Sequence, residues 1–588
     1  MKRLSIVLFL LLIAAGVWGW FKMTAPAKPL ALAEPLRINQ GLVLGGIDAD
    51  NSDIQVFNGI PYASARRWAA PGAPPQWGAM PRDVREYGAE CIQVRKGMNG
   101  FVNGIIDGAG LPGWKRFAAK KYMSAMPAPA EAEDCLFINV RTSNIGNDTL
   151  LPVMVWIHGG SHQAGAGSSE FYQANALVEN GVVLVTFNYR LGPFGYMAHP
   201  ALTEEAGTSG NYGLMDQAAA LRWVRDNIRS FGGDPDNVTI FGESAGAQSV
   251  SELMASTIAD GLYHKAILES GTSSYNANYL SEAPLPGSRS MESIGEEFLS
   301  TFVDRTATAA ELRSIPAASI ITRAEQRADL AGYFLPNVDD KILPDTVGAT
   351  IRAGNAADVP ILAGYNADEG SLFYSAFQSP TVLARGITGS LEEREQRLAE
   401  VFGENQAKAL EALYGMDTLE TWDEGATDML GDDMFGVHMR FLGKANATAG
   451  NPTWMYFFTR ATPTRAQSIG AYHGSEIPFV FGSASPLLPM SDKDEKLAET
   501  MQAYWTNFAR TGDPNGPSLP EWPAYDPNRD EWQVLDHEIL TVAGVRARKL
   551  DILEENLIDR IDAVSRATSS QPPFEATLMS TVPKSGDE

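Results

Sequence analysis

The stretch that decides the fold is residues 238–246, Val-Thr-Ile-Phe-Gly-Glu-Ser-Ala-Gly, which small and polar residues follow. A β-favouring run here enters a tight turn and continues into residues that can start a helix. Gly242 and Gly246 stand two positions before and after Ser244, where the backbone passes close to itself and leaves no room for a side chain. The pattern predicts a nucleophile elbow. In that turn the Ser244 hydroxyl points outward, and the N–H of Ala245 faces the place where an oxyanion would form.

A serine hydroxyl at neutral pH needs a base within reach and an acid that orients the base. The chain has seven histidines, and in folds built on this turn the order along the chain is serine, acid, histidine. His264, His438, His473 and His537 are the histidines that follow the serine. The best candidate is His473, because it stands in the glycine-flanked segment 470–476, and catalytic groups collect on such loops. His537 is the reserve, whereas the other two have the surroundings of packing or surface residues.

The acid is harder to identify, because the chain has 71 Asp and Glu residues. Residues 359–370 form a short apolar run that enters a polar turn closed by glycine. This places Asp368 or Glu369 at the carboxyl end of a strand, where catalytic groups collect in open α/β sheets. Spacing alone does not choose between the two carboxylates.

A second group of oxyanion donors is expected after an earlier strand. Residues 152–157 are a continuous apolar run, typical of a strand buried on both faces, and His-Gly-Gly-Ser follows at 158–161. Glycines at such a position let main-chain N–H groups approach a substrate oxygen. The alternative is an ordinary glycine-rich turn.

Longer strings elsewhere in the chain carry a family resemblance. They include Phe-Asn-Gly-Ile-Pro-Tyr-Ala at 57–63, Glu-Asp-Cys-Leu-Phe-Ile-Asn-Val at 133–140, Asn-Tyr-Arg-Leu-Gly-Pro-Phe-Gly at 188–195, the blocks at 210–214 and 231–235, Tyr-Trp-Thr-Asn-Phe-Ala at 504–509 and Thr-Gly-Asp-Pro-Asn at 511–515. With these strings and the elbow, the chain resembles the type-B carboxylesterases, the family that includes the cholinesterases, and in particular its bacterial para-nitrobenzyl-esterase-like members. The resemblance covers roughly residues 37–545.

The resemblance implies a role for each candidate residue. Ser244 is the expected nucleophile and His473 the expected base. The family pattern makes Glu369, rather than Asp368, the expected acid. The expected oxyanion donors are the backbone N–H groups of Gly160, Ser161 and Ala245.

The resemblance also implies an activity, that of a serine carboxylic-ester hydrolase that forms an acyl-enzyme on small to medium esters. Many relatives have Gly or Ala where this chain has Ser161, and an aromatic residue where it has the polar pair 162–163. We therefore consider a polar acyl group. The alternatives are a lipase-type or sterol-ester-type hydrolase of long-chain esters and, in another class, a binding protein that keeps the fold without catalysis. No cofactor is expected, and no histidine has a metal-ligand spacing that would indicate a metal site.

Apolar strands alternate with helical stretches along the chain, as at 182–187 and 215–228. This alternation is typical of an α/β protein with a mostly parallel sheet covered by helices on both faces. The resemblance specifies an α/β-hydrolase fold with large insertions. No long Gly/Ser or Pro linker divides the chain, so we predict a single catalytic domain over residues 36–564.

The two ends of the chain differ from this body. At the start, Lys2 and Arg3 precede an apolar run over residues 4–21 and a Pro/Ala-rich spacer to residue 35. This predicts an export signal and a secreted or periplasmic enzyme, with an uncleaved membrane anchor as the alternative. At the other end, apolar residues at helical spacing over 550–564 predict an amphipathic helix, and 565–588 has the composition of a disordered tail.

The net charge of −25 disfavours nucleic acid and anionic membrane surfaces as partners. We expect a small-molecule ester as the partner, a membrane tether through residues 4–21 at most, and a monomer or homodimer.

Cys91 and Cys135 are the only cysteines, and export favours a disulfide between them. The resemblance pairs Cys135 with an upstream cysteine across an Ω-shaped loop, which matches Cys91. We expect the enclosed segment to be a solvated loop. Alternatively it overhangs the site and attracts an anionic group of the substrate, because it carries the cations Arg95, Lys96, Lys115, Arg116, Lys120 and Lys121.

Overall fold

A computed structural model describes residues 28–125, 129–173, 175–275, 278–285, 287–376, 389–461, 467–483 and 489–565. The predicted export signal and the predicted disordered tail therefore lie almost entirely outside the described residues. Within the described ranges, every helix is too short or too polar to cross a membrane.

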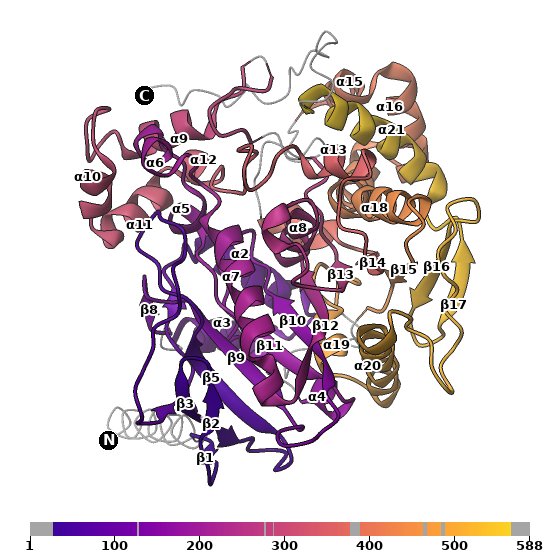
Figure 1. Cartoon of the computed structure of the whole chain (residues 1–588). Helices are drawn as coiled ribbons and strands as arrows, with labels where there is room; N and C mark the ends of the chain where they lie inside the picture. The colour runs from indigo at the N-terminus through magenta and orange to yellow at the C-terminus, as the bar shows by residue number, and fades with distance from the viewer. Residues whose placement is uncertain are drawn as a thin grey trace, which may run out of the picture.

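The centre of the molecule is a sheet of twelve strands (Figure 1). Strands β11, β10, β12, β13, β14, β15 and β16 lie side by side in this order and are parallel. Antiparallel strands extend both ends. In spatial order the strands are β1 (Leu30–Ala31), β4 (Gly46–Ile47), β5 (Gln55–Pro61), β9 (Phe137–Thr142), β11 (Val183–Phe187), β10 (Leu151–Ile157), β12 (Gly233–Glu243), β13 (Lys265–Glu269), β14 (Ile361–Asn366), β15 (Thr453–Phe458), β16 (Glu531–Leu535) and β17 (Leu540–Ala543).

Both faces of this sheet are buried, each in its own core. Successive side chains of β10 pack alternately into the two cores. Val153, Val155 and Ile157 pack in one core, and Met154 and Trp156 pack in the other, as the period of two in a strand requires. The first core is covered by α7 (Tyr212–Asn227), α8 (Ala245–Met254), α18 (Val437–Thr448) and α21 (Ala547–Val564), and the second by α4 (Ala176–Glu179), α19 (Ile477–Phe481) and α20 (Asp492–Thr511). The predicted α/β-hydrolase fold is confirmed.

Further helices are insertions around this body (Figure 1). One group forms its own apolar cluster and consists of α5 (Gly192–Tyr196), α6 (Pro200–Ala206), α9 (Met291–Leu299), α10 (Ala309–Ser314), α11 (Ala317–Gln326) and α12 (Ala328–Ala331). The others are α13 (Val347–Arg352), α14 (Gly370–Ala376), α15 (Leu391–Phe402), α16 (Glu404–Tyr414) and α17 (Leu419–Gly431). Single turns are η1 (Glu170–Tyr172), η2 (Ile228–Phe231), η3 (Thr257–Ala259) and η4 (Asp432–Gly436).

Two small sheets complete the amino-terminal half. They are β2 (Leu36–Ile38) with β3 (Gly41–Leu44) and β6 (Arg82–Asp83), and β7 (Glu90–Cys91) with β8 (Glu131–Ala132). Because β1 pairs with β4, the chain enters the central sheet within the segment predicted to be a spacer. At the other end, α21 ends at Val564, as the apolar spacing predicts.

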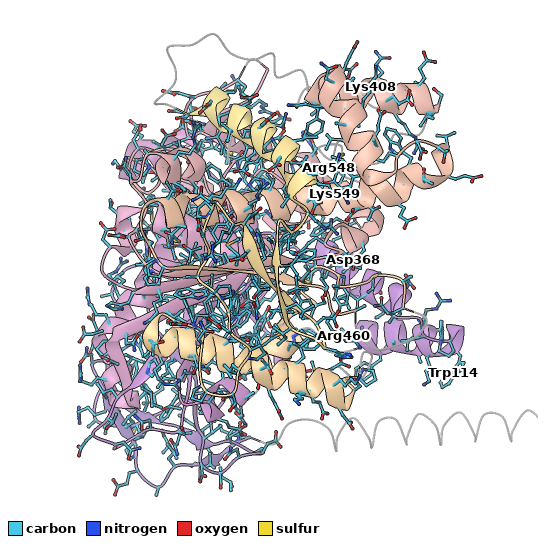
Figure 2. All side chains as sticks on the ribbon, turned by 90° about the vertical axis from the view of Figure 1, so that its right-hand side faces the viewer. Trp114, Asp368, Lys408, Arg460, Arg548 and Lys549 are labelled. Carbon is cyan, nitrogen blue, oxygen red and sulfur yellow. A yellow bond between two sulfur atoms is a disulfide. The ribbon has the colours of Figure 1, made fainter. Side chains whose placement is uncertain are left out.

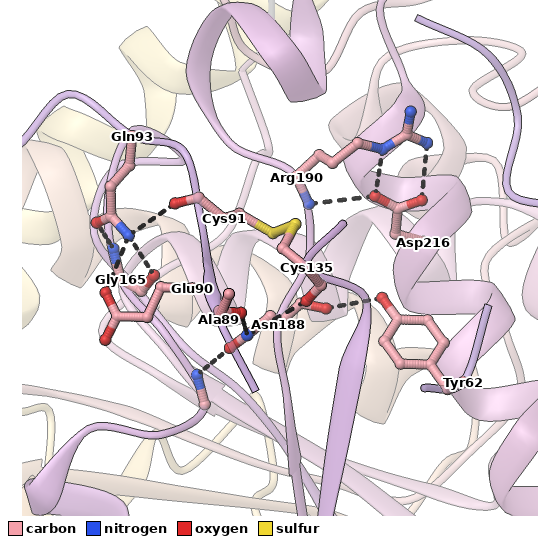
Figure 3. The surroundings of a disulfide bond; sticks show 11 residues. Tyr62, Ala89, Glu90, Cys91, Gln93, Cys135, Gly165, Asn188, Arg190 and Asp216 are labelled. Carbon is pink, nitrogen blue, oxygen red and sulfur yellow. Dashed lines mark hydrogen bonds and ion pairs between the residues drawn. A yellow bond between two sulfur atoms is a disulfide. The ribbon is translucent and has the colours of Figure 1, made fainter. Parts of the chain in front are cut away.

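Cys91 and Cys135 are joined by a disulfide (Figure 3). It lies beside the buried ion pair between Arg190 and Asp216, whose Nε and Oδ2 atoms are 2.7 Å apart. The prediction that the enclosed segment is a loop was wrong, because it contains two helices, α2 (Lys96–Gly108) and α3 (Gly113–Ala125).

Candidate active site

The elbow is present as the sequence predicts. β12 ends at Glu243, α8 begins at Ala245, and Ser244 between them has φ +56° and ψ −123°. A β-carbon on Gly246 would lie 1.9 Å from the carbonyl oxygen of Ile157, so only glycine fits there. A non-glycine residue in this backbone region costs of the order of 1–3 kcal/mol, and the surrounding packing holds Ser244 in it.

Strand register brings the carboxyl ends of four strands to the same edge. Ile157 of β10 is opposite Gly242 of β12, and Glu243 is opposite Glu269 of β13. Glu269 is in turn opposite Gly364 of β14. The segments that follow these strands therefore meet around Ser244.

Glu369 and His473 are in direct contact at this edge. Glu369 Oε2 lies 2.6 Å from His473 Nδ1, and Glu369 Oε1 accepts a hydrogen bond of 2.7 Å from the N–H of Asn366. Both side chains are buried. Asp368 has a different partner, since its Oδ2 accepts from the N–H of Ala471 at 2.7 Å. Of the two carboxylates that spacing left open, Glu369 is thus the one on the imidazole.

Aromatic rings hold the imidazole of His473 in place. The ring of Phe435 stacks on it with centroids 4.6 Å apart, and the rings of Phe373 and Phe101 lie at 4.9 Å and 6.1 Å. Nε2 of His473 lies 3.1 Å from Oε1 of Glu243, the residue directly before Ser244. The imidazole therefore lies between Glu369 and the elbow.

The other candidate histidines have different partners. Nδ1 of His264 accepts from the N–H of Val238 at 3.1 Å. His438 lies in α18, where burial lowers its pKa to about 4. Nε2 of the reserve candidate, His537, lies 2.8 Å from Oδ1 of Asp494 in the first turn of α20.

Sequence reasoning missed a set of buried carboxyls around the site. Burial, and after it the charge of Glu369, raises the pKa of Glu243 well above its ordinary value. Burial also raises the pKa of Glu269 to about 8, although Trp505 Nε1 donates to its Oε1 at 2.7 Å. The pKa of Glu476 is raised by burial and by its acidic neighbours. In all three carboxyls, burial therefore favours the neutral form over the charged form. No local sequence pattern marks these residues, because the strand register that places Glu243 opposite Glu269 is known only from the structure.

The segment after β10 has an uncommon backbone. Gly160, Ser161 and His162 all have positive φ, at +111°, +55° and +56°, and a β-carbon on Gly160 would lie 2.0 Å from the carbonyl oxygen of Ala164. A β-carbon on Gly159 would lie 3.2 Å from Cβ of Ser244, so the segment adjoins the elbow. Within the described residues, the N–H groups of Gly160, Ser161 and Ala245 donate to no backbone acceptor.

The polar side chains at 162 and 163 have packing roles. His162 is buried against Tyr196, with ring centroids 5.1 Å apart, and burial lowers its pKa to about 3. Gln163 Nε2 donates to the carbonyl oxygen of Phe334 at 3.0 Å. Their polarity therefore gives no support for a polar acyl group, whereas Ser161 is exposed at the site. Among the described side chains, no group of three or more His, Cys, Asp or Glu is arranged to hold a metal ion.

The fold, the elbow and the contact between Glu369 and His473 are those of an α/β-hydrolase. The carboxylesterase family model matches residues 33–552, so the chain belongs to the carboxylesterase family and is a carboxylic ester hydrolase.

Individual relatives agree with this assignment. The chain is 35% identical over 496 residues to the para-nitrobenzyl esterase of Bacillus subtilis (strain 168), covering 83% of this chain and 92% of that protein. It is 31% identical over 538 residues to the fumonisin B1 esterase of Sphingopyxis macrogoltabida, covering 87% and 89%. A solved structure of a PNB esterase superposes with a TM-score of 0.71 at 32% identity, covering 89% of this chain and 100% of that one.

Proposed function

We propose that the chain hydrolyses small to medium esters through an acyl-enzyme on Ser244, with His473 as the base and Glu369 as the acid that orients it. The observation that carries the proposal is the position of the His473 imidazole. Its Nδ1 lies 2.6 Å from Glu369, and its Nε2 faces the elbow at Glu243.

In the acylation step, Nε2 of His473 takes the proton of the Ser244 hydroxyl as Oγ attacks the ester carbonyl. Glu369 accepts the Nδ1 proton in a hydrogen bond, which fixes the tautomer and stabilises the imidazolium. The imidazolium then donates its proton to the leaving alkoxide, and the alcohol departs. In the second step, water loses a proton to Nε2 of His473 and attacks the acyl carbon. The bond between this carbon and Ser244 Oγ then breaks, the imidazolium returns the proton to Oγ, and the acid departs.

The tetrahedral intermediates carry a negative oxygen, for which we assign the N–H groups of Gly160, Ser161 and Ala245 as donors. In the described part of the chain these N–H groups donate to no backbone acceptor, which supports this role, because preorganised donors stabilise the charge without reorganisation. Ala245 is also the first residue of α8, where the helix dipole favours negative charge.

A cation near the site would favour esters that carry an anionic group. Lys96 is exposed at the start of α2, the helix that carries Phe101 to His473, so it would attract an anionic group on the ester. Lys120 is a weaker candidate because its Nζ is 2.6 Å from Asp107 Oδ2 in an exposed ion pair. Lys96→Glu should raise KM for carboxylated esters selectively. An equal change for neutral esters contradicts this part of the proposal.

We also infer that the enzyme is exported. The disulfide between Cys91 and Cys135 supports this, because disulfides persist in oxidising compartments, and the apolar residues 4–21 supply a signal. Fractionation of the source cells, with sequencing of the mature amino terminus, tests export and cleavage together. A protein confined to the reducing cytoplasm contradicts it.

The direct test of the catalytic proposal is hydrolysis of an ester panel that varies acyl length, alcohol size and charge separately. Ser244→Ala should abolish turnover of every ester that the wild type hydrolyses. Ser300→Ala is the matched control, because this serine is exposed and its hydroxyl donates to the carbonyl oxygen of Glu297. Full activity in Ser244→Ala would overturn the proposed mechanism.

A further inference from the structure

Helix α3 presents apolar side chains to solvent. Trp114 is 71% exposed and Phe117 is 66% exposed, more than any other aromatic side chain in the described part of the chain. Tyr122 and Met123 of the same helix are each 41% exposed. Because residues three and four apart share a helix face, Trp114, Phe117 and Ala118 form one outward surface. A surface helix of a globular protein normally turns such a face toward the core.

The same helix is strongly basic. It contains Lys115, Arg116, Lys120 and Lys121 and no acidic residue, although the whole chain has a net charge of −25. Nζ of Lys115 lies 5.7 Å from the ring centroid of Trp114. Aromatic and cationic groups thus alternate on one short exposed element.

The position of α3 leaves this surface accessible. It packs mainly against α2, and Figure 2 shows Trp114 at the outer edge of the molecule, on a helix that projects from the body. Helix α2 in turn contacts α14 and carries Phe101 to the ring of His473. The projecting helix is therefore joined to the molecule next to the site.

We propose that α3 is a docking surface for anionic phospholipid membranes, with Trp114 and Phe117 entering the interface and Lys115, Arg116 and Lys121 contacting the headgroups. Exposed aromatic rings with basic side chains beside them are features of helices that bind in the interfacial plane of a bilayer. Trp rings favour the interface because they are amphipathic. Each cation near an anionic surface contributes about 1 kcal/mol, a factor of about five in binding.

Charge disfavours a second copy of the chain on this surface and favours an anionic membrane. In a symmetric dimer through this face, Lys115, Arg116 and Lys121 would approach the same cations of the second copy and repel them. The acidic remainder of the chain does not prevent docking. At about 0.1 M salt, charges more than roughly 10 Å away are largely screened, so the local cations dominate at the surface.

Sedimentation of the full chain with vesicles of phosphatidylcholine, with and without phosphatidylglycerol, tests the proposal. The variant Lys115→Glu/Arg116→Glu/Lys121→Glu should weaken binding to the anionic vesicles by at least about a hundredfold. Trp114→Ala/Phe117→Ala should weaken binding to both compositions by roughly tenfold or more. Residues 4–21 are unchanged in every variant, so differences among variants report on α3. Binding of the α3 variants equal to that of the wild type overturns the proposal, as does a wild type that does not bind.

Matched controls separate docking from folding and catalysis. Phe171→Ala/Leu540→Ala removes two other exposed apolar side chains, 51% and 49% exposed, and should bind like the wild type. Ser244→Ala should also bind like the wild type, so failure of docking and failure of the proposed chemistry are distinguishable. A solvatochromic dye on Ala118→Cys should shift to the blue with anionic vesicles, and no shift contradicts the proposal. If the α3 variants bind vesicles like the wild type and differ from it only in oligomeric state, the surface serves self-association. That result also overturns the proposal.

Discussion

The edge of the sheet around Ser244 and the segment closed by the disulfide are neighbours with opposite physical character. At the sheet edge, Glu369 and His473 are buried, and even a methyl group at Gly246 would meet the backbone 1.9 Å away. In α3, Trp114 and Phe117 are largely exposed, and a β-carbon at Gly113 would meet nothing within 4 Å.

This difference shows in which parts of the molecule internal contacts determine the geometry. Around Ser244, backbone sterics, strand register and buried hydrogen bonds all require the same arrangement, so a small change there has a large cost. In α3, Trp114 and Phe117 are largely exposed, so substitutions of these side chains should act on what the surface contacts.

The largest contrast is expected in catalysis. Ser244→Ala and His473→Ala should each lower kcat/KM for a water-soluble ester by at least about ten-thousandfold, because the nucleophile and the base act as a unit. Trp114→Ala, in contrast, should leave this value within about twofold of the wild type. Steady-state kinetics measures all three variants. A comparable loss of kcat/KM in Trp114→Ala would show that the two regions do not differ in their effect on catalysis.

The disulfide tests the connection between the two regions. Removing the link across 44 residues with Cys91→Ala/Cys135→Ala should lower the free energy of unfolding by about 4 kcal/mol, through the greater freedom of the unfolded chain. Urea unfolding measures this difference. A reducing agent should bring the wild type to the stability of the variant and leave the variant unchanged; an equal response of both proteins would refute the explanation.

A buried carboxyl in α8, the helix that follows Ser244, should make the free energy of unfolding depend on pH. Burial raises the pKa of Glu252 in α8 from 4.5 to about 8, although Ser273 Oγ donates to it at 2.6 Å. The unfolded chain loses this proton first, so the contribution of Glu252 is fully present below pH 4.5 and is lost as the pH rises toward 8. The free energy of unfolding of Glu252→Gln, relative to that of the wild type, should therefore increase by roughly 3 kcal/mol between pH 4 and pH 7.

Unfolding curves at several pH values measure this gain. Asp107→Asn is the control from the other region. Its exposed ion pair with Lys120 contributes less than about 1 kcal/mol, so the variant should follow the wild type across the pH range. A pH-independent difference between Glu252→Gln and the wild type would show that Glu252 is ionised when folded.

The smallest effect is expected at Ser161, although it adjoins the site. The proposed oxyanion donor is its main-chain N–H, which Ser161→Ala retains, so kcat should change by less than about tenfold. Loss of a donor typically costs a hundred- to thousandfold. Steady-state kinetics distinguishes the two cases. A hundred- to thousandfold loss of kcat in Ser161→Ala would show that the Ser161 hydroxyl, rather than its N–H, is the oxyanion donor.

The sequence predicted those features of the molecule that depend on local sterics. Gly242 and Gly246 are needed by any strand–turn–helix this tight, so the elbow could be recognised without a structure. The choice of Glu369 over Asp368 came from the family resemblance alone, because both stand at the same strand end. The structure places Glu369 on the imidazole and Asp368 on the N–H of Ala471.

Two features that depend on distant segments were not predicted. The raised pKa values of Glu243, Glu269 and Glu476 follow from burial by several strands, and no local pattern shows such burial. The two helices inside the disulfide were expected to be a loop. Gly97, Gly100, Gly104 and Gly108 lower the helix propensity of α2, but its contact with α14 compensates.

Labelling with an organophosphonate tests whether Ser244 is the nucleophile. Mass spectrometry of the digested protein should find one phosphonyl group per chain, on the peptide that contains Ser244, in step with the loss of ester hydrolysis. Ser244→Ala should take up no label. Inactivation with the label on another residue, or ester hydrolysis that persists after Ser244 is fully labelled, would show that Ser244 is not the nucleophile.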